Sequence, residues 1–374
     1  MNPHIVSIGY GRQLFVPNNS ERERLAHCAK ETTSLHMIVF SLRTHGLAQE
    51  QVTDTFILYP THSAHRFFML FDAIRIGMRI ARKRKPGEKW CITAQDPLAS
   101  GVVGFVLAKL TRIPLVVQEH GDIFSGSYWK NESVTHRLWY VVARCVAHSA
   151  ERVRAVSLRV KKHLEDSGVK EERIVVLPVY TDVSKFLHTV NITEEPRETC
   201  TILSVARFVK QKNLLLLLRA FANVYTENTH ARLILVGSGH EQEALQKEIE
   251  VLNIRSVVTI LPWTDDVVSL MRSADAYALS SNYEGWGRVL IEAMACGVPS
   301  VTTEVGCVGE VFIHEKHGMV VPIGDESAFA DALKELVENA PKRVRFGVQG
   351  SHDAASLFPS IQTYASAWAK IHLF

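Results

Sequence analysis

The sequence predicts two doubly wound α/β domains that face each other across a cleft. The chain has 374 residues, more than one ordinary hydrophobic core accommodates. Short apolar strands alternate with amphipathic helices throughout, a pattern typical of parallel sheets with helical crossovers. A polar stretch at residues 189–199, with Pro196 and several acids, divides this alternation into two series and is the predicted linker.

The first series predicts an N-terminal domain over residues 1–188. Its strands are short runs rich in Val, Ile and Leu, at 4–8, 35–40, 90–93, 115–118, 152–156 and 174–177. Its helices carry apolar residues at helical spacing, at 21–30, 64–83, 97–110, 134–147 and 158–166.

The second series predicts a C-terminal domain over residues 189–359. Strands are predicted at 201–206, 232–237, 257–261, 274–279 and 300–302, and helices at 214–226, 240–252, 266–273 and 325–339. A final amphipathic helix begins near residue 360, with Ile361, Tyr364, Trp368 and Ile371 on one stripe.

Composition indicates a soluble globular protein of a reducing compartment. Apolar residues make up 47% and charged residues 22% of the chain, and a net charge of +3 does not call for nucleic acid. The six cysteines are scattered without a CxxC pair, which argues against a zinc site and a disulfide framework. The N-terminus resembles a strand rather than a signal peptide, and no apolar run approaches the roughly 20 residues that span a bilayer. We therefore expect a cytoplasmic protein.

The stretch 280–299 carries the strongest functional signal. Glu284 lies in a polar loop, and Glu292 follows inside an apolar helix. Gly285 and Gly287 stand where loop becomes helix, after an apolar strand. This strand–loop–helix unit points free backbone N–H groups and a positive helix end at one spot, which suits a phosphate. The alternative is that Glu284 merely caps the helix and Glu292 is solvated.

This segment resembles the Glu-x7-Glu signature of retaining, nucleotide-sugar-dependent glycosyltransferases of the GT-B fold, family 4 (glycosyl transferases group 1). The match continues in register through residues 305–310 and 318–322. The resemblance implies two Rossmann-like domains: an acceptor-side domain at 1–188, onto which the helix at 360–374 packs back, and a nucleotide-sugar domain at 189–359.

Two cations follow the strand at 201–206. Arg207 and Lys212 lie in a loop between strand and helix, where cations can clamp a diphosphate. The pair resembles the family's Arg-x4-Lys element. The family usually has Gly next, and this chain has Asn213, which also tolerates unusual turn conformations. The alternative is a solvated basic loop.

The N-terminal domain offers weaker signals. His120 ends a predicted strand and, with the preceding segment 92–97, resembles the family's His near the reacting sugar. Gly9 and Gly11 follow the first strand, where glycine would let the backbone approach a ligand, although a simple tight turn explains them nearly as well. Arg12 could meet either phosphate or acceptor.

Trp263 is the remaining nucleotide-binding candidate. It lies in the segment 262–267, where relatives read the base through the backbone, so the sequence does not assign the base. Asp266 serves equally well as a helix N-cap. Relatives need no divalent metal, and the adjacent pair Asp265-Asp266 is not an Asp-x-Asp element. We expect neither a metal nor a cofactor beyond the donor.

The resemblance implies a division of roles around a nucleotide-diphosphate sugar. Arg207, Lys212 and the helix start would stabilise the leaving diphosphate, Glu292 would hold the ribose, and Glu284 the donor sugar. His120 would position that sugar from across the cleft. The further donor contacts would come from Gly285, Trp286, Gly287, Val289 and Leu290.

The implied activity is transfer of a sugar to a glycan or lipid-linked acceptor, in cell-surface polysaccharide or glycolipid synthesis. A sugar phosphorylase, a nucleotide-sugar epimerase and a non-catalytic sugar-nucleotide-binding protein are the alternatives. The segment 67–89 adds a peripheral membrane contact on the inner face, because Phe67, Phe68 and Phe71 precede a run of Arg and Lys. The alternative there is a buried crossover helix with a solvated basic end.

Overall fold

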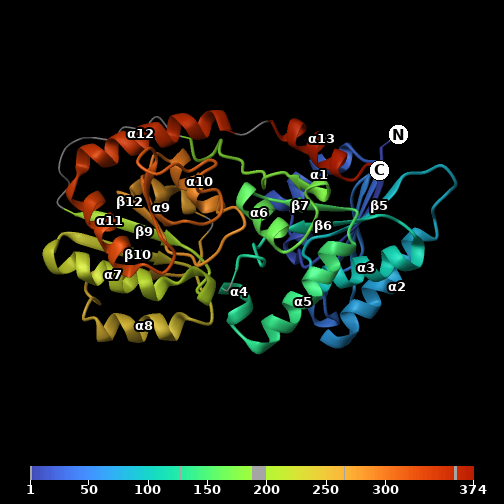
Figure 1. Cartoon of the computed structure of the whole chain (residues 1–374), viewed down its shortest axis with the longest axis horizontal. Coiled ribbons are helices and arrows are strands. Elements are labelled where there is room, and N and C mark those ends of the chain that lie inside the picture. The colour runs from blue at the N-terminus through green and yellow to red at the C-terminus, as the bar shows by residue number, and fades with distance from the viewer. Residues whose placement is uncertain (1, 127, 188–198, 265, 358–359) are drawn as a thin grey trace. The chain divides into compact units, whose positions relative to one another are not determined.

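The computed structural model describes residues 2–126, 128–187, 199–264, 266–357 and 360–374. The chain forms two compact units (Figure 1): unit 1 is Met1–Tyr180 with Pro359–Phe374, and unit 2 is Thr181–Phe358. The sequence placed the boundary at 188/189. Residues 181–187 belong to unit 2, where Val183 and Phe186 are buried and Arg272 donates a hydrogen bond to the carbonyl of Lys185. Residues 189–198 of the predicted linker lie outside the described part of the chain.

Unit 1 contains a sheet with the strand order β3-β4-β2-β1-β5-β6-β7-β8, parallel except for β3. The strands are β1 (His4–Gly9), β2 (Ser34–Val39), β3 (Glu50–Thr53), β4 (Phe56–Pro60), β5 (Trp90–Ala94), β6 (Leu115–Glu119), β7 (Arg152–Ala155) and β8 (Ile174–Val176). The sequence did not predict the β3–β4 hairpin. Strand β3 is polar, and β4 ends in a proline, a residue that is uncommon within strands.

Helices cover both faces of this sheet. One face carries α2 (Met69–Ala81), α3 (Ala99–Thr111) and α5 (Val134–Ser149), with α3 in contact with both neighbours (Figure 1). The other face carries α1 (Ser20–Lys30) and α13 (Ile361–Ile371), which pack together. Tyr364 and Trp368 of α13 enter the core beside Leu25, and buried Arg154 donates to the Tyr364 hydroxyl at 3.1 Å. Helix α6 (Leu158–Asp166) packs on β7 and β8, and α4 (Tyr128–Asn131) precedes α5.

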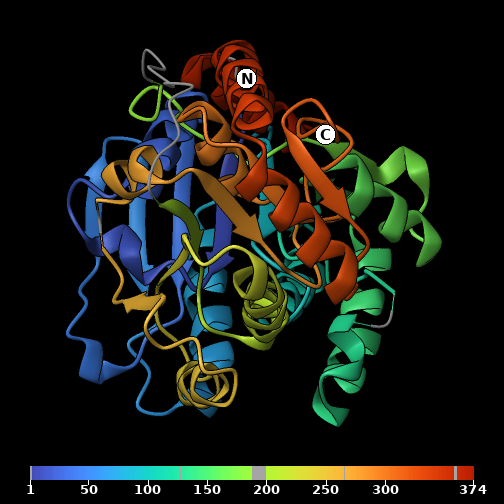
Figure 2. The same ribbon diagram turned by 90° about the vertical axis from the view of Figure 1, so that its left-hand side faces the viewer.

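Unit 2 contains a fully parallel sheet with the order β11-β10-β9-β12-β13-β14. The strands are β9 (Cys200–Val205), β10 (Ala231–Val236), β11 (Val258–Leu261), β12 (Ala276–Leu279), β13 (Ser300–Thr303) and β14 (Gly318–Val321). Helices α7 (Leu214–Glu227), α8 (Gln242–Val251) and α11 (Glu326–Glu338) lie on one side, and α9 (Val267–Ser273), α10 (Arg288–Ala295) and α12 (Ala340–Leu357) on the other (Figures 1 and 2). The sequence did not predict β14 or α12. In α12, Pro341 and two glycines weaken the helical pattern.

Both sheets have the strand order of Rossmann-like folds, which confirms the predicted fold class. In unit 2 the order reverses between β9 and β12, and in unit 1 between β1 and β5. Such sheets bind ligands beyond the carboxyl ends of the strands at this switch point. The loops that follow β9 and β12 carry the two strongest sequence motifs.

Short 3-10 turns complete the described chain, at Arg12–Phe15, Arg43–His45, Arg66–Phe68, Glu171–Arg173 and Lys210–Lys212. Among the described residues, no helix combines the length and the apolar character needed to cross a bilayer.

Candidate functional site

Two loops of unit 2 are bonded to each other at the switch point. The loop after β9 contains residues 206–213, and the loop after β12 contains residues 280–287. Asn282 donates its backbone N–H to the Gln211 carbonyl at 2.8 Å, and the Gln211 amide donates to the Tyr283 carbonyl at 2.9 Å. The Ser280 hydroxyl donates to the Lys212 carbonyl at 2.9 Å. These bonds fix the two loops as one structural element.

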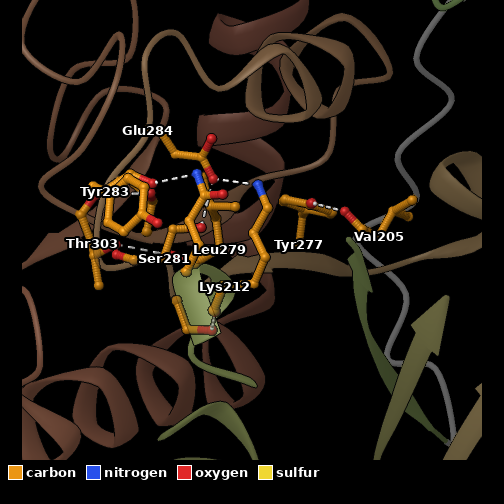
Figure 3. A network of polar contacts seen from close by, with 11 residues as sticks. Val205, Lys212, Tyr277, Leu279, Ser281, Tyr283, Glu284 and Thr303 are labelled. Carbon is orange, nitrogen blue, oxygen red and sulfur yellow. Dashed lines mark hydrogen bonds and ion pairs between the residues drawn. The ribbon is translucent and has the colours of Figure 1, made fainter. Parts of the chain in front are cut away.

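Lys212 and Glu284 form an ion pair between these loops (Figure 3). Both side chains are largely buried, at 13% and 10% exposure. The Ser281 hydroxyl donates to the same oxygen, Glu284 Oε1, at 2.7 Å. The carbonyl of Ser281 in turn accepts from the Thr303 hydroxyl at 2.6 Å, so β13 supports the arrangement. A charged pair held by hydrogen bonds and shielded from water keeps a fixed geometry.

Arg207 stands at the start of the same loop with an exposed side chain. Of the two cations in this loop, Lys212 is therefore held in place by an ion pair, and Arg207 is exposed to solvent. Asn213, which replaces the family's glycine, has φ 46° and ψ 45°. This left-handed conformation is one that asparagine tolerates, as the sequence predicted.

Helix α10 presents an N-terminus without a side-chain cap. Its N-cap is Gly287, and the helix begins at Arg288. Glu284 pairs with Lys212 instead of capping, so the capping alternative for Glu284 is wrong. Val289 is half-buried, and Leu290 is buried. The backbone N–H of Leu290 donates to the Gly287 carbonyl at 2.9 Å.

The loop before α10 is hydrogen-bonded to a second loop, which contains Gly306 and Cys307. Trp286 is 4% exposed, and its carbonyl accepts from the Cys307 N–H at 2.9 Å. Gly306 has φ 58°, and a Cβ there would lie 2.6 Å from the Trp286 carbonyl oxygen. Only glycine lets this backbone approach Glu284 and Trp286 so closely.

Glu292 lies one turn into α10 and is 9% exposed, so the solvated alternative is wrong for it too. Arg288 is its i−4 neighbour, with 3.5 Å between Nη2 and Oε1. Burial raises the pKa of Glu292, because desolvation penalises the carboxylate more than Arg288 and Lys185 stabilise it.

Trp263 follows β11 and is 59% exposed, unlike most tryptophans. Asp266 accepts from the Ser269 N–H at 3.2 Å and is the N-cap of α9. Asp265 lies outside the described residues.

Unit 1 places His120 directly after β6, half-buried. Burial lowers the pKa of His120 well below its ordinary value, and the cations Arg154 and Arg24 act in the same direction. Gly9 ends β1, where a Cβ would lie 2.8 Å from Gln95 Cγ, and a Cβ on Gly11 would lie 3.0 Å from Leu14 Cδ1. Side chains of unit 1 therefore pack closely against both glycines, and the contact of these glycines with a ligand stays a prediction.

Among the described residues, no group of three or more His, Cys, Asp and Glu side chains is arranged to hold a metal ion. The sequence did not indicate the supporting roles of Gln211, Ser281, Thr303 and Gly306. Ser281 stood inside the recognised motif, but nothing in the sequence indicated that Thr303 lies beside it.

Comparison with known proteins identifies the class to which this fold belongs. The family described as Glycosyl transferases group 1 matches residues 188–353, and the family described as Glycosyl transferase 4-like domain matches residues 24–179. The chain therefore belongs to the family 4-type glycosyltransferases of the GT-B fold.

Individual relatives agree with this class. N-acetyl-alpha-D-glucosaminyl L-malate synthase of Bacillus anthracis is 33% identical over 159 residues, which is 42% of this chain and 42% of that protein. The Escherichia coli UDP-Gal:alpha-D-GlcNAc-diphosphoundecaprenol alpha-1,3-galactosyltransferase is 24% identical over 271 residues, 67% of each chain. The crystal structure of HepE of Anabaena in complex with UDP-glucose has a TM-score of 0.74 at 19% identity, covering 98% of this chain and 99% of that one, and shows the shared fold. The chain thus spans under half the length of the first of these relatives.

Proposed function

We propose that this protein is a retaining glycosyltransferase that transfers a sugar from a nucleotide-diphosphate sugar to a glycan or lipid-linked acceptor. The observation that carries the proposal is the buried Lys212–Glu284 pair at the switch point of unit 2. It joins the cation proposed for the diphosphate to the acid proposed for the donor sugar.

The positive charges of the site would act on the leaving nucleoside diphosphate. When the bond between the anomeric carbon and the phosphate oxygen breaks, its electron pair leaves with the nucleoside diphosphate. Lys212, Arg207 and the uncapped N-terminus of α10 would stabilise this growing negative charge. Because Lys212 is already held by Glu284, it needs little reorganisation to do so.

The remaining roles follow from position. Glu292 on α10 would accept hydrogen bonds from the ribose hydroxyls, and Glu284 from hydroxyls of the donor sugar. His120 is neutral in the ordinary pH range because its pKa is lowered, so it would contact the sugar as an uncharged imidazole. Trp263 and the backbone beside it would face the base.

Retention of configuration would arise from attack on the same face that the phosphate leaves. The acceptor hydroxyl oxygen would bond to the anomeric carbon, and its proton would pass to the departing phosphate oxygen. No step in this sequence requires a divalent metal. The anomeric proton coupling in the product's NMR spectrum and the rate in excess EDTA test these two points.

The name of the E. coli relative states a UDP-galactose donor and a diphosphoundecaprenol-linked acceptor, and the HepE complex holds UDP-glucose. They support a nucleotide-sugar donor and a lipid-linked acceptor here, in cell-surface polysaccharide or glycolipid synthesis in the cytoplasm. Isothermal titration with UDP, GDP and ADP tests the donor site. Saturable binding of one of them, lost in Glu292→Gln, is the expected result, and no binding of any nucleoside diphosphate would contradict the proposal.

A lipid-linked acceptor would suit a surface of unit 1 that carries exposed apolar and basic side chains. Phe67 and Phe68, in the 3-10 turn before α2, and Phe71, in the first turn of α2, are exposed. Arg75 and Arg79 are also exposed, farther along the same helix. The opposite face of α2 belongs to the core, since Ala73, Ile76, Gly77 and Ile80 are buried, as the crossover-helix alternative predicted, and the membrane contact of the exposed face stays a prediction.

The second part of this surface lies on α5, where the sequence carries no clear signal. On α5 the exposed residues Val134, Leu138 and Val141 stand at helical spacing beside Arg137 and Arg144. Helices α2 and α5 both flank α3 on one face of the sheet. Apolar side chains next to cations favour an anionic lipid surface, so we extend the proposed peripheral contact from 67–89 to α5.

A further inference from the structure

The turn that follows β6 is folded around the carboxyl group of Glu119. This side chain is 1% exposed. Its Oε1 accepts the backbone N–H of Gly121 at 2.8 Å and that of Ile123 at 3.4 Å. His120 stands between Glu119 and Gly121, so these bonds fix the peptide on either side of the candidate sugar-binding residue.

The second oxygen of Glu119 is in a different situation. Oε2 is buried and has no hydrogen-bond partner among the described residues. Two other acids act on the same carboxyl group: Asp122 in the turn and Asp96 in the loop after β5. A carboxylate with an unsatisfied oxygen, out of water and beside two acids, is strongly disfavoured relative to the neutral acid. The proton then belongs on Oε2, because Oε1 already accepts two bonds.

We infer that Glu119 is a positioning residue for His120: its buried carboxyl group folds the turn 119–123 through Oε1, and ionisation of this group in alkali disturbs the turn, because the charged and unpartnered Oε2 is then drawn toward water. The inference rests on the proposed role of His120. It makes activity depend on a group that need not touch the substrate.

Two further observations agree with it. Burial is the largest influence and raises the pKa of Glu119 to about 8, with the acids adding to the effect and the two N–H bonds opposing it. Asp122 holds the other end of the turn at φ 57°, and its carboxylate accepts from His163 Nδ1 of α6 at 2.8 Å. The cations Arg154 and Arg24 lower the pKa of His120, and Asp96 raises the pKa of Tyr10.

The variant Glu119→Gln separates ionisation from shape. Glutamine keeps an acceptor oxygen for the two N–H groups and cannot ionise, whereas Glu119→Ala removes the acceptor. The readout is the NMR signal of the His120 ring in the full chain between pH 6 and 9.5, assigned by its loss in His120→Asn. Because the pKa of His120 is well below this range, its own titration does not interfere.

The wild-type His120 signal should shift with a midpoint near pH 8, Glu119→Gln should show no such shift, and Glu119→Ala should be displaced at every pH. The inflection should persist in His163→Asn. An inflection that survives in Glu119→Gln, or none in the wild type, would overturn the inference.

Turnover gives the second readout. The wild-type rate should fall above pH 8 while Glu119→Gln keeps its rate, and Glu119→Ala should lose about 10²-fold at pH 7 through misplacement of His120. Parallel pH profiles for the wild type and Glu119→Gln would also contradict the inference. Absence of any turnover in the wild type would count against the proposed function, and the NMR result would still decide the role of Glu119.

Discussion

Lys212 and Glu284, which lie 72 residues apart in the sequence, share one buried ion pair that joins the loops after β9 and β12. The sequence motifs assign these residues to different parts of the donor. The structure makes each the partner of the other, so a change in one also disturbs the second.

Removing the cations should slow transfer. Lys212→Ala and Arg207→Ala are each expected to lower turnover about 10²-fold or more, because each would remove a contact to the charged leaving group. Lys212→Ala should in addition lower thermal stability, since it leaves Glu284 buried without its cation. Lys210→Ala, an exposed cation of the same loop, is the matched control and should retain wild-type turnover. Near-wild-type rates in both test variants would remove the diphosphate assignment.

The two acids should separate by ligand. Glu292→Gln is expected to weaken the binding of bare nucleoside diphosphate. Glu284→Gln keeps an acceptor oxygen for Lys212, so it should retain most of that binding while it impairs turnover of the intact donor. Both substitutions keep the side-chain shape, and calorimetry with nucleoside diphosphate measures the difference. Equal loss of nucleotide affinity in both variants would show that this division of roles is wrong.

The buried acid Glu292 should make stability depend on pH. Its pKa is raised in the folded state, so the native protein holds this proton more tightly than the unfolded chain does. The stabilising effect of the proton is fully present below the ordinary Glu range and is lost as pH rises through the raised pKa. Urea unfolding from pH 4 upward should therefore show the wild type losing stability relative to Glu292→Gln. A difference that does not change with pH would contradict the burial argument.

Gly306 and Gly309 form a matched pair for testing the loop that supports Trp286. Both have positive φ, at 58° and 89°, but an added Cβ meets the Trp286 carbonyl at Gly306 and nothing within 4 Å at Gly309. Gly309→Ala should destabilise by about 1 kcal/mol through backbone strain alone. Gly306→Ala should destabilise by roughly 1–3 kcal/mol more through overpacking, and should lower turnover as the 284–287 loop shifts. Equal effects in urea unfolding would mean that the close approach is unimportant.

The proposed lipid surface should respond to charge and to apolar area separately. Sedimentation with anionic vesicles is expected to decrease in Arg75→Glu/Arg79→Glu and in Phe67→Ser/Phe71→Ser, with about 1 kcal/mol for each cation at low salt. Added salt should weaken the wild-type interaction, because the Debye length is about 10 Å at 0.1 M. Val251→Ser, an exposed apolar residue of unit 2, is the control. Equal sedimentation with neutral and anionic vesicles would argue against the contact.

The sequence predicted the regular core of both units well, because buried parallel strands such as β1 and β9 read as short apolar runs between clear turn signals. It missed β3 and α12, whose polar residues, proline and glycines hide the pattern, and these elements are stabilised by tertiary packing instead. The motifs located both loops of the candidate site. They did not predict that Lys212 pairs with Glu284 or that Thr303 supports Ser281, since such contacts depend on which strands become neighbours.

The proposed function requires that the protein cleave the bond between a sugar and a nucleoside diphosphate at the loops after β9 and β12. Release of nucleoside diphosphate from a panel of UDP-, GDP- and ADP-sugars, measured without acceptor in the wild type and in Glu284→Gln, tests it most directly. We expect slow release from donors of one base in the wild type, and release at least about 10²-fold slower in the variant. Release from none of the donors, or equal release by the two proteins, would contradict it.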